Sequence, residues 1–409
     1  MSRKNDLVRQ QYEALPYPAR DPADEITRLV VGSPSQLNEI EHYIFAGRRA
    51  GPLNVLVAGG GTGDGAIMLA QQLADRGEGG QVQYIDLSEA SLRIAKARAA
   101  ARGLDNIQFA QHSLLDVGSL ASGPYDYIDC CGVLHHLPEP IVGLQSLSDA
   151  LNDDGGMGLM LYGKYGRTGV YPMQQAFARL FPYNLPTEKR LAGAKAVMKA
   201  LPDSNWLKHN AFLGDHILGD DAGFYDLLLH SRDRAYTVSE ISTLTDIAGM
   251  CVTGFIEQAK YDPTLYLPDG EISKRATKLP WLEQCSLAEE LSGSMKTHVF
   301  YAIKASNRTG GAASLNEQKN VPLIRDISSS ALADAIAKQP LLKANFEGSA
   351  FQRKLPASAP DIIRLCDGQR NIKQVRKASG LSDAAFKRDF RVIYDALWPL
   401  NLMLLAGRL

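Results

Sequence analysis

The chain has 409 residues, of which 45% are hydrophobic and 22% charged, and its formal net charge is −1. This length predicts two or three structural units, and the composition is typical of a globular protein with a sizeable core. A nearly neutral chain has no overall electrostatic attraction to nucleic acid or membranes, although its net charge does not exclude a local basic patch. No run of about 18 apolar residues predicts a membrane span.

Five cysteines are widely spaced along the chain, and no C-x-x-C pair occurs: Cys130, Cys131, Cys251, Cys285 and Cys366. This pattern predicts neither a zinc site nor a disulfide framework, so we expect no bound metal. The first residues lack the apolar run of a signal peptide. A reducing, cytoplasmic location is therefore expected.

In chain order, residues 1–50 are predicted to form an N-terminal helical arm, which Pro16 and Pro18 interrupt before a helix at about 34–47. Short apolar runs then alternate with helical patterns. Strands are expected at 53–58, 81–87, 107–110, 125–131 and 156–162, with helices at 64–76, 88–102 and 138–151. This alternation predicts an α/β fold with a parallel sheet and helices on both faces.

Residues 163–236 break the rhythm and predict a helical insertion. Thr237 and Glu240 form a capping-box pattern at the start of a helix that ends at Gly249. Strands follow at 251–257 and 298–304, with a second, polar insertion at 258–297 between them.

The small polar residues at 307–322 predict a flexible linker, and 323–409 is expected to be a separate, small α-rich module. Helices are expected near 328–338, 359–366, 372–379 and 383–397, and a strand at 402–405. The helix-turn-helix pattern at 372–386 resembles a winged-helix unit.

Residues 325–409 hold 14 Lys or Arg against 8 Asp or Glu, and Lys387, Arg388 and Arg391 lie on the second helix of that pattern. These cations permit phosphate contacts, but acidic residues are interleaved with them. We expect protein contact or homodimerisation and keep nucleic-acid binding as the alternative.

The strongest motif is the glycine cluster Gly59, Gly60, Gly61 and Gly63, placed where an apolar strand meets a helix. Glycines allow a tight turn and a close approach of the backbone to a ligand. The following helix presents unpaired N–H groups and the positive end of its dipole. A lone Gly-x-Gly-x-Gly is a weak signal, and its strand–loop–helix context strengthens it.

Asp86 ends the second strand, 23 residues after Gly63. A carboxylate there can accept hydrogen bonds from both hydroxyls of a ribose. The alternative is that Asp86 caps the next helix, a role that Ser88 could fill equally well.

Two further motifs are Phe109 to Asp116 and Tyr125 to Leu137, the latter ending in Leu-His-His-Leu. The four motifs together resemble class I S-adenosylmethionine-dependent methyltransferases of the Leu-His-His-Leu type, over roughly residues 50–163 and 237–304. The resemblance implies a Rossmann-like mixed sheet of seven strands within a methyltransferase domain at 51–306. It also implies that the segment from Tyr12 to Pro18 in the 1–50 arm lies over the cofactor pocket as part of a lid. The alternative is a rigid turn whose aromatic rings fill the edge of the core.

The implied cofactor is S-adenosylmethionine. The implied cofactor-binding residues are Gly59, Gly60, Gly61, Gly63, Asp64, Asp86, Leu87, Ser113, Leu114, Cys131 and Gly132. This sequence departs from the family at Val57, where an acid usually helps to hold the cofactor's amino group, and at Ser113, where Asp often bonds the adenine. Asp64 could compensate for the first departure, and Ser113 could bond the adenine weakly.

The motifs say little about the methyl acceptor. Tyr165, Arg167 and Tyr171, which follow the fifth strand, and His230 are candidates for contact with it, with a solvated helix end and local ion pairs as the alternative. Methyl transfer mainly needs alignment, and a base only if the acceptor is protonated. The candidate bases are Tyr12, Tyr17, His136 and His230.

The adjacent histidines His135 and His136 point to different sides of a turn and do not suggest a shared metal ion. We expect methyl transfer to a small molecule or a protein side chain. One alternative is an RNA or DNA methyltransferase that docks through the C-terminal module. The other is a cofactor-binding regulatory protein with weak catalysis.

Overall fold

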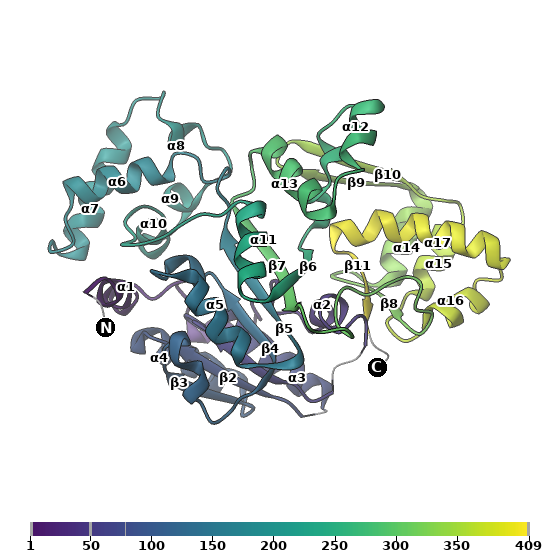
Figure 1. Cartoon of the computed structure of the whole chain (residues 1–409), viewed down its shortest axis with the longest axis horizontal. Coiled ribbons are helices and arrows are strands. Elements are labelled where there is room, and N and C mark those ends of the chain that lie inside the picture. Colours follow the sequence, from purple (N-terminus) through teal and green to yellow (C-terminus); the bar gives the residue numbers. More distant parts are fainter. Residues whose placement is uncertain (1–2, 49–50, 78, 407–409) are drawn as a thin grey trace.

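The computed structural model describes residues 3–48, 51–77 and 79–406. Its centre is a seven-stranded sheet in the order β3-β2-β1-β4-β5-β7-β6, and β7 runs antiparallel to both of its neighbours (Figure 1). The strands are β1 (Asn54–Ala58), β2 (Gln81–Asp86), β3 (Ile107–Gln111), β4 (Tyr125–Cys131), β5 (Leu151–Tyr162), β6 (Met250–Phe255) and β7 (Thr297–Lys304). The predicted Rossmann-like mixed sheet is therefore confirmed.

Both faces of the sheet are covered because alternate side chains of each strand point to opposite sides. Val55 and Val57 of β1 join one apolar core with α2 (Leu37–Tyr43), α3 (Asp64–Arg76) and α4 (Glu89–Arg102). Leu56 and Ala58 join the other core with α5 (Pro140–Asp149), α11 (Val238–Ile247) and α13 (Trp281–Ser292). The capping box predicted at the start of α11 is present.

The insertion after β5 is helical and lies at one end of the molecule (Figure 1). It contains α6 (Val170–Leu180), α7 (Thr187–Ala200), α8 (Trp206–His209), α9 (Asp215–Leu218) and α10 (Asp221–Leu228). Its own apolar cluster includes Phe177, Leu191 and Phe224. The insertion before β7 holds the 3₁₀ helices η4 (Gln258–Tyr261) and η5 (Pro263–Leu265), together with α12 (Glu271–Ala276) and α13.

The C-terminal residues form a separate apolar cluster at the opposite end of the molecule (Figure 1). The elements are β8 (Val321–Ile324), α14 (Ser329–Lys338), β9 (Leu341–Phe346), β10 (Ser349–Lys354), α15 (Ala359–Leu365), α16 (Ile372–Ala378), α17 (Asp383–Leu397) and β11 (Met403–Ala406). Strands β8 and β11 pair antiparallel, and β9 and β10 form a hairpin that was not predicted.

The segment expected as a linker is hydrogen-bonded to the end of α2. The amide of Gly311 donates to the carbonyl of Ile44 at 2.9 Å, and the amide of Ala313 donates to the carbonyl of His42 at 2.7 Å. These bonds fix the chain between β7 and β8 against the central domain. Across the described residues, no helix has both the length and the apolar character needed to cross a membrane.

The N-terminal arm consists of α1 (Arg3–Ala14) and a 3₁₀ helix, η1 (Pro22–Ile26). Both contact α4, so the arm runs along the helix that follows β2. The arm therefore brings residues 12–20 over the loops that follow β1 and β2.

Candidate active site

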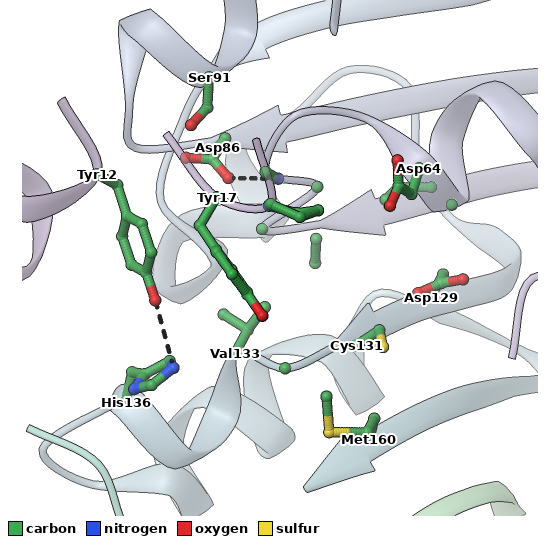
Figure 2. Close-up of a pocket in the computed structure, with 18 of the residues that line it drawn as sticks. Tyr12, Tyr17, Asp64, Asp86, Ser91, Asp129, Cys131, Val133, His136 and Met160 are labelled. Carbon is green, nitrogen blue, oxygen red and sulfur yellow. Dashed lines mark hydrogen bonds between the residues drawn. The ribbon is translucent and has the colours of Figure 1, made fainter. Parts of the chain in front are cut away.

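A cavity of about 550 Å³ opens where β1, β2 and β4 end (Figure 2). In open α/β sheets this edge is the usual ligand-binding position, and the volume is typical of small-molecule sites. Of the residues predicted to bind the cofactor, ten line the cavity: Gly59, Gly60, Gly61, Asp64, Asp86, Leu87, Ser113, Leu114, Cys131 and Gly132. Gly63 is the exception, since it forms the N-cap of α3 with φ of 104°.

The glycine loop is folded around the carboxylate of Asp86. The amide of Gly61 donates to Oδ2 of Asp86 at 2.8 Å, and the amide of Ser88 donates to Oδ1 at 2.8 Å. Burial raises the pKa of Asp86, and these two N–H groups oppose the rise. Gly61 has φ of 53°, and a Cβ atom there would lie 2.8 Å from the carbonyl oxygen of Tyr17. Glycine at this position therefore lets the arm approach the loop.

Ser88 caps α4, because its side chain accepts from the amide of Ser91. Asp86 is thus not needed as the cap, and each of its oxygens still has acceptor capacity toward the cavity. The Ser113 side chain accepts from the amide of Leu115 at 3.2 Å and so caps the next 3₁₀ helix. A hydroxyl used in this way can still donate one hydrogen bond.

The N-terminal arm is attached to both loops. Glu13 accepts from the amides of Glu89 and Ala90 at the start of α4, at 2.6 and 3.1 Å, where a carboxylate also complements the helix dipole. The hydroxyl of Thr62 donates to the carbonyl of Pro18 at 2.7 Å. Tyr12 and Tyr17 thereby line the cavity from the arm (Figure 2).

Asp64 is held by two guanidinium groups. Arg20 approaches Oδ2 at 2.6 Å from the arm, and Arg98 approaches Oδ1 at 2.7 Å from α4. The hydrogen bonds to both arginines lower the pKa of Asp64 against the opposing effect of burial. Arg98 is itself buried and paired with Glu25 at 2.5 Å. The charge of Asp64 is therefore already balanced within the chain.

On the opposite side of the cavity, the phenol of Tyr12 lies among three ionisable side chains. Its hydroxyl donates to Oδ1 of Asp226 at 2.9 Å and lies 3.4 Å from Nε2 of His136 and 3.3 Å from Nε2 of His230. The hydroxyl of Tyr162 donates to the other oxygen of Asp226 at 2.9 Å. Burial and the Asp226 carboxylate raise the pKa of Tyr12, so the phenol holds its proton.

The backbone of Arg232 distinguishes the two imidazoles. Nδ1 of His136 lies 2.9 Å from the Arg232 carbonyl, which can only accept, so Nδ1 carries the proton and Nε2 presents a lone pair. Nδ1 of His230 accepts from the Arg232 amide at 3.0 Å, so the proton of the neutral ring is on Nε2. Burial lowers the pKa of His230 and keeps it neutral. His136 is therefore the acceptor facing the cavity.

His136, Asp226 and His230 offer nitrogen and oxygen atoms within 4.8 Å of one another, a spacing that a metal ion could use. A histidine nitrogen must be unprotonated to bind a metal ion. Because the amide of Arg232 donates to Nδ1 of His230, the proton of that ring is on Nε2, which therefore cannot act as a ligand. The Tyr12 hydroxyl also lies between the three groups. The cluster is better described as a hydrogen-bond network.

The remaining predicted acceptor residues are dispersed. Arg167 lines the cavity, but its guanidinium is buried, pairs with Asp233 at 2.8 Å and stacks on the ring of Tyr162 at 3.7 Å. Tyr165 and Tyr171 are not among the residues that line the cavity. His135 packs against Tyr162 with ring centroids 3.9 Å apart, while His136 faces the cavity.

Several polar residues of the cavity lining are not among those predicted, and they include Asp129, Tyr162 and Asp226. Asp226 lies in the helical insertion, where no sequence pattern distinguishes it from the other acids. Asp129 and Tyr162 lie within predicted strands, and strand periodicity alone does not separate a cavity-facing side chain from a core one.

Residues 56–157 match the family model described as a methyltransferase domain. The chain contains a class I S-adenosylmethionine-dependent methyltransferase domain. The cofactor of this domain is S-adenosylmethionine, and the cavity fits it: the glycine loop leaves room for a ligand beside the backbone, and Asp86 offers acceptors for hydroxyl groups.

Several curated proteins are similar to parts of this chain. An uncharacterised protein of a Synechococcus strain is 29% identical over 62% of this chain and 60% of its own length. The tRNA 5-carboxymethoxyuridine methyltransferase of Escherichia coli is 38% identical over 28% of this chain and 42% of its own length. The ubiquinone biosynthesis O-methyltransferase of Leptothrix cholodnii is 30% identical over 33% of this chain and 54% of its own length. The chain thus spans 60% or less of the length of these curated relatives.

Among solved structures, PKMT2 from Rickettsia typhi in complex with AdoHcy is similar to nearly the whole chain. The TM-score is 0.61 at 16% identity, and the similarity covers 94% of this chain and 76% of that one. At this identity the comparison supports the fold.

Proposed function

We propose that this protein transfers the methyl group of S-adenosylmethionine to an oxygen or nitrogen atom of a small molecule or a protein side chain. The main support for this proposal is that one cavity is lined both by the glycine loop with Asp86 and, on the opposite side, by His136, whose Nε2 is left as a proton acceptor. Bound S-adenosylmethionine supplies an electrophilic methyl group on its sulfonium. The chain must then orient a nucleophile and remove its proton.

His136 is the base in this proposal. An imidazole whose Nδ1–H is held by a backbone carbonyl presents Nε2, which lies 3.4 Å from the Tyr12 hydroxyl, as the atom that accepts a proton from an acceptor hydroxyl or ammonium. Asp226 lies within the same network and stabilises the positive charge that His136 then carries. Tyr12 and Tyr162 hold the Asp226 carboxylate in place through its two oxygens. Tyr17 covers the glycine loop.

The arm and the helical insertion would close the cavity over both ligands. Tyr12 from the arm and Asp226 from the insertion meet directly, so each segment stabilises the position of the other. Exclusion of water at this point would favour transfer of the methyl group to the acceptor. Of the sequence-predicted acceptor residues, Arg167 is a positioning residue in this scheme, because Tyr162 and Asp233 engage its guanidinium.

The C-terminal module is proposed to be a winged-helix-like unit for protein contact. Its arginines favour this over nucleic acid: Arg376, Arg388 and Arg391 pair with Asp383, Asp389 and Asp395. The tRNA methyltransferase relative covers 28% of the chain, so it supports the nucleic-acid alternative only weakly. Strongly salt-dependent tRNA binding would favour that alternative. The five cysteines are free thiols, which supports a reducing, cytoplasmic location.

The test is formation of S-adenosylhomocysteine when the protein and S-adenosylmethionine are incubated with cell extract and with a panel of phenols, amines and peptides. We expect turnover in the wild type and a fall in kcat of about 100- to 10,000-fold in His136→Asn, with the Kd for S-adenosylhomocysteine unchanged. His209→Asn, an exposed histidine on α8, is the matched control. Cofactor binding without turnover in any mixture would favour the regulatory alternative, and turnover by His136→Asn at the wild-type rate would exclude His136 as the base.

A further inference from the structure

The cavity contains an acidic side chain, near the glycine loop, that no cation among the described residues compensates. Asp129 lies on β4, is 2% exposed and lines the cavity. The hydroxyl of Ser35 donates to its Oδ2 at 2.5 Å. Among the described residues this is its one hydrogen bond, and no Lys, Arg or His forms an ion pair with it. A buried carboxylate in this state is costly unless a ligand completes it.

The two other cofactor-side acids are satisfied. Asp64 is paired with Arg20 and Arg98. Asp86 accepts two backbone N–H groups. Asp129 differs from both, because its carboxylate has neither a cationic partner nor two N–H donors among the described residues. A positively charged group of a ligand would supply the missing partner.

The position of Asp129 indicates which positively charged group of the ligand it would bind. In the parallel pairing of β1 and β4, Asp129 is the register partner of Val57, so the two side chains project from the same face of the sheet. Asp129 also lies against the first turn of α3, where a Cβ atom on Gly65 would be 3.3 Å from its Oδ2. Figure 2 shows Asp129 across the cavity from Tyr12 and His136, away from the proposed site of methyl transfer.

We infer that Asp129 binds the α-ammonium group of the cofactor's amino-acid end, taking from β4 the place of the acid that Val57 does not supply on β1. This inference rests on the proposed function, because it assumes that the cavity binds S-adenosylmethionine. The sulfonium is the other cationic group of the cofactor, but it must face the acceptor beside His136, on the other side of the cavity. Asp129 is a binding and positioning residue that helps to set the direction of the methyl group.

The same geometry explains the roles of Ser35 and Gly65. Ser35 holds one carboxylate oxygen, which leaves the second oxygen for the ligand. Gly65 leaves room for the hydrogen bond between Ser35 and Asp129, since a Cβ atom at position 65 would also lie 2.8 Å from Oγ of Ser35. Burial raises the pKa of Asp129 to about 6, and the Ser35 hydrogen bond opposes the rise. Near neutral pH the carboxylate is therefore mostly ionised and able to pair with an ammonium group.

The experiment is isothermal titration calorimetry of the full chain with three probes: S-adenosylhomocysteine, S-adenosylmethionine and 5′-methylthioadenosine, which lacks the amino-acid end. We expect Asp129→Asn to weaken S-adenosylhomocysteine and S-adenosylmethionine equally, by about 10- to 100-fold, because both carry the ammonium group. Binding of 5′-methylthioadenosine should change less than about two-fold. Asp126→Asn, on the same strand but outside the cavity lining, is the matched control and should leave all three affinities unchanged.

Three results would overturn the inference. An unchanged affinity for S-adenosylhomocysteine in Asp129→Asn would show that the carboxylate does not contact the ammonium. A loss confined to S-adenosylmethionine would place it at the sulfonium, and an equal loss for 5′-methylthioadenosine would indicate general damage to the cavity. If the wild type binds S-adenosylhomocysteine while the variant shows one of these patterns, the proposed function stands and this inference alone fails. A wild type that binds none of the probes overturns both.

Discussion

The two sides of the cavity are built in different ways. Most of the cofactor side comes from one stretch, Val57 to Gly132, whose polar residues follow strands of the parallel sheet or lie on them, and the arm and Ser35 complete it. The other side joins Tyr12 of the arm, His136 after β4, Tyr162 at the end of β5 and Asp226 of the helical insertion. Local chain geometry thus fixes most of the first side, and tertiary contact assembles the second.

The difference separates what is general in this fold from what is particular to this chain. A loop between a strand and a helix can hold a cofactor wherever that unit occurs. The meeting of Tyr12 with Asp226 exists only when the arm and the insertion are both in place. We therefore expect cofactor affinity to depend on residues of the first side and turnover on residues of the second.

The largest expected effect concerns stability and again involves Asp129. Its folded-state pKa of about 6, against 3.8 for an unperturbed carboxyl, means that the folded protein binds the proton more tightly than the unfolded chain. The contribution of Asp129 to the free energy of unfolding is thus most favourable below about pH 4 and falls as pH rises through about 6, by about 3 kcal/mol in all. Without cofactor, Asp129→Asn should be more stable than the wild type by up to about 3 kcal/mol above pH 6, and similar to it below pH 4.

Urea unfolding between pH 4 and 8 measures this difference. Four neighbouring groups sense the Asp129 charge, namely Tyr127, Tyr301, Cys130 and Cys131, and their own pKa values are raised, so they stay neutral over this range. A variant less stable than the wild type at pH 8 would contradict the prediction and show that the chain itself compensates the charge.

Removal of Asp86 tests the cofactor side directly. Asp86→Ala deletes the acceptor for the amides of Gly61 and Ser88 and the proposed acceptor for the ribose. We expect the Kd for S-adenosylhomocysteine to rise about 100-fold in calorimetry, because hydrogen bonds to a buried charged group are lost. Asp116→Ala, an exposed acid in the next loop, should bind as the wild type does. Unchanged binding in Asp86→Ala would remove Asp86 from the site.

Loss of the Tyr12 hydroxyl tests the acceptor side. Tyr12→Phe keeps the ring but leaves one oxygen of Asp226 and Nε2 of His230 without their shared partner. We expect kcat to fall about 10-fold while the Kd for S-adenosylhomocysteine stays within about two-fold. If kcat and affinity fell together, Tyr12 would act by holding the arm closed, and the separation between the two sides would fail.

The same division explains what could be predicted from sequence. The limits of α3 and β4 agree with the predicted ranges, because glycine punctuation and apolar periodicity are local signals. Asp226 could not be identified, since its importance arises from contacts with Tyr12 and Tyr162, which are distant in sequence. Likewise, the uncompensated charge of Asp129 follows from the absence of cations around it among the described residues, a property of packing and not of spacing.

Turn chemistry accounts for the hairpin that was not predicted. Strands β9 and β10 are joined by Glu347 and Gly348, which have φ of 52° and 99°. Asn-Gly or Asp-Gly is the usual sequence signal for a two-residue turn with positive φ, and glutamate is uncommon there. Asn345 supplies a side-chain acceptor to the amide of Gly348 at 2.9 Å, which stabilises this turn.

The smallest expected effect comes from Tyr165, which the sequence placed among the acceptor-contacting candidates. It is 36% exposed and does not line the cavity, so Tyr165→Phe should change kcat and KM by less than about two-fold. Tyr162→Phe, three residues earlier, removes a hydrogen bond to Asp226 and should lower kcat by several-fold more than Tyr165→Phe does. If instead Tyr165→Phe raised KM for the acceptor while Tyr162→Phe did not, the acceptor would bind outside the cavity, on the exposed loop after β5. The base would then have to be sought there, because His136 would lie too far from the reacting atom.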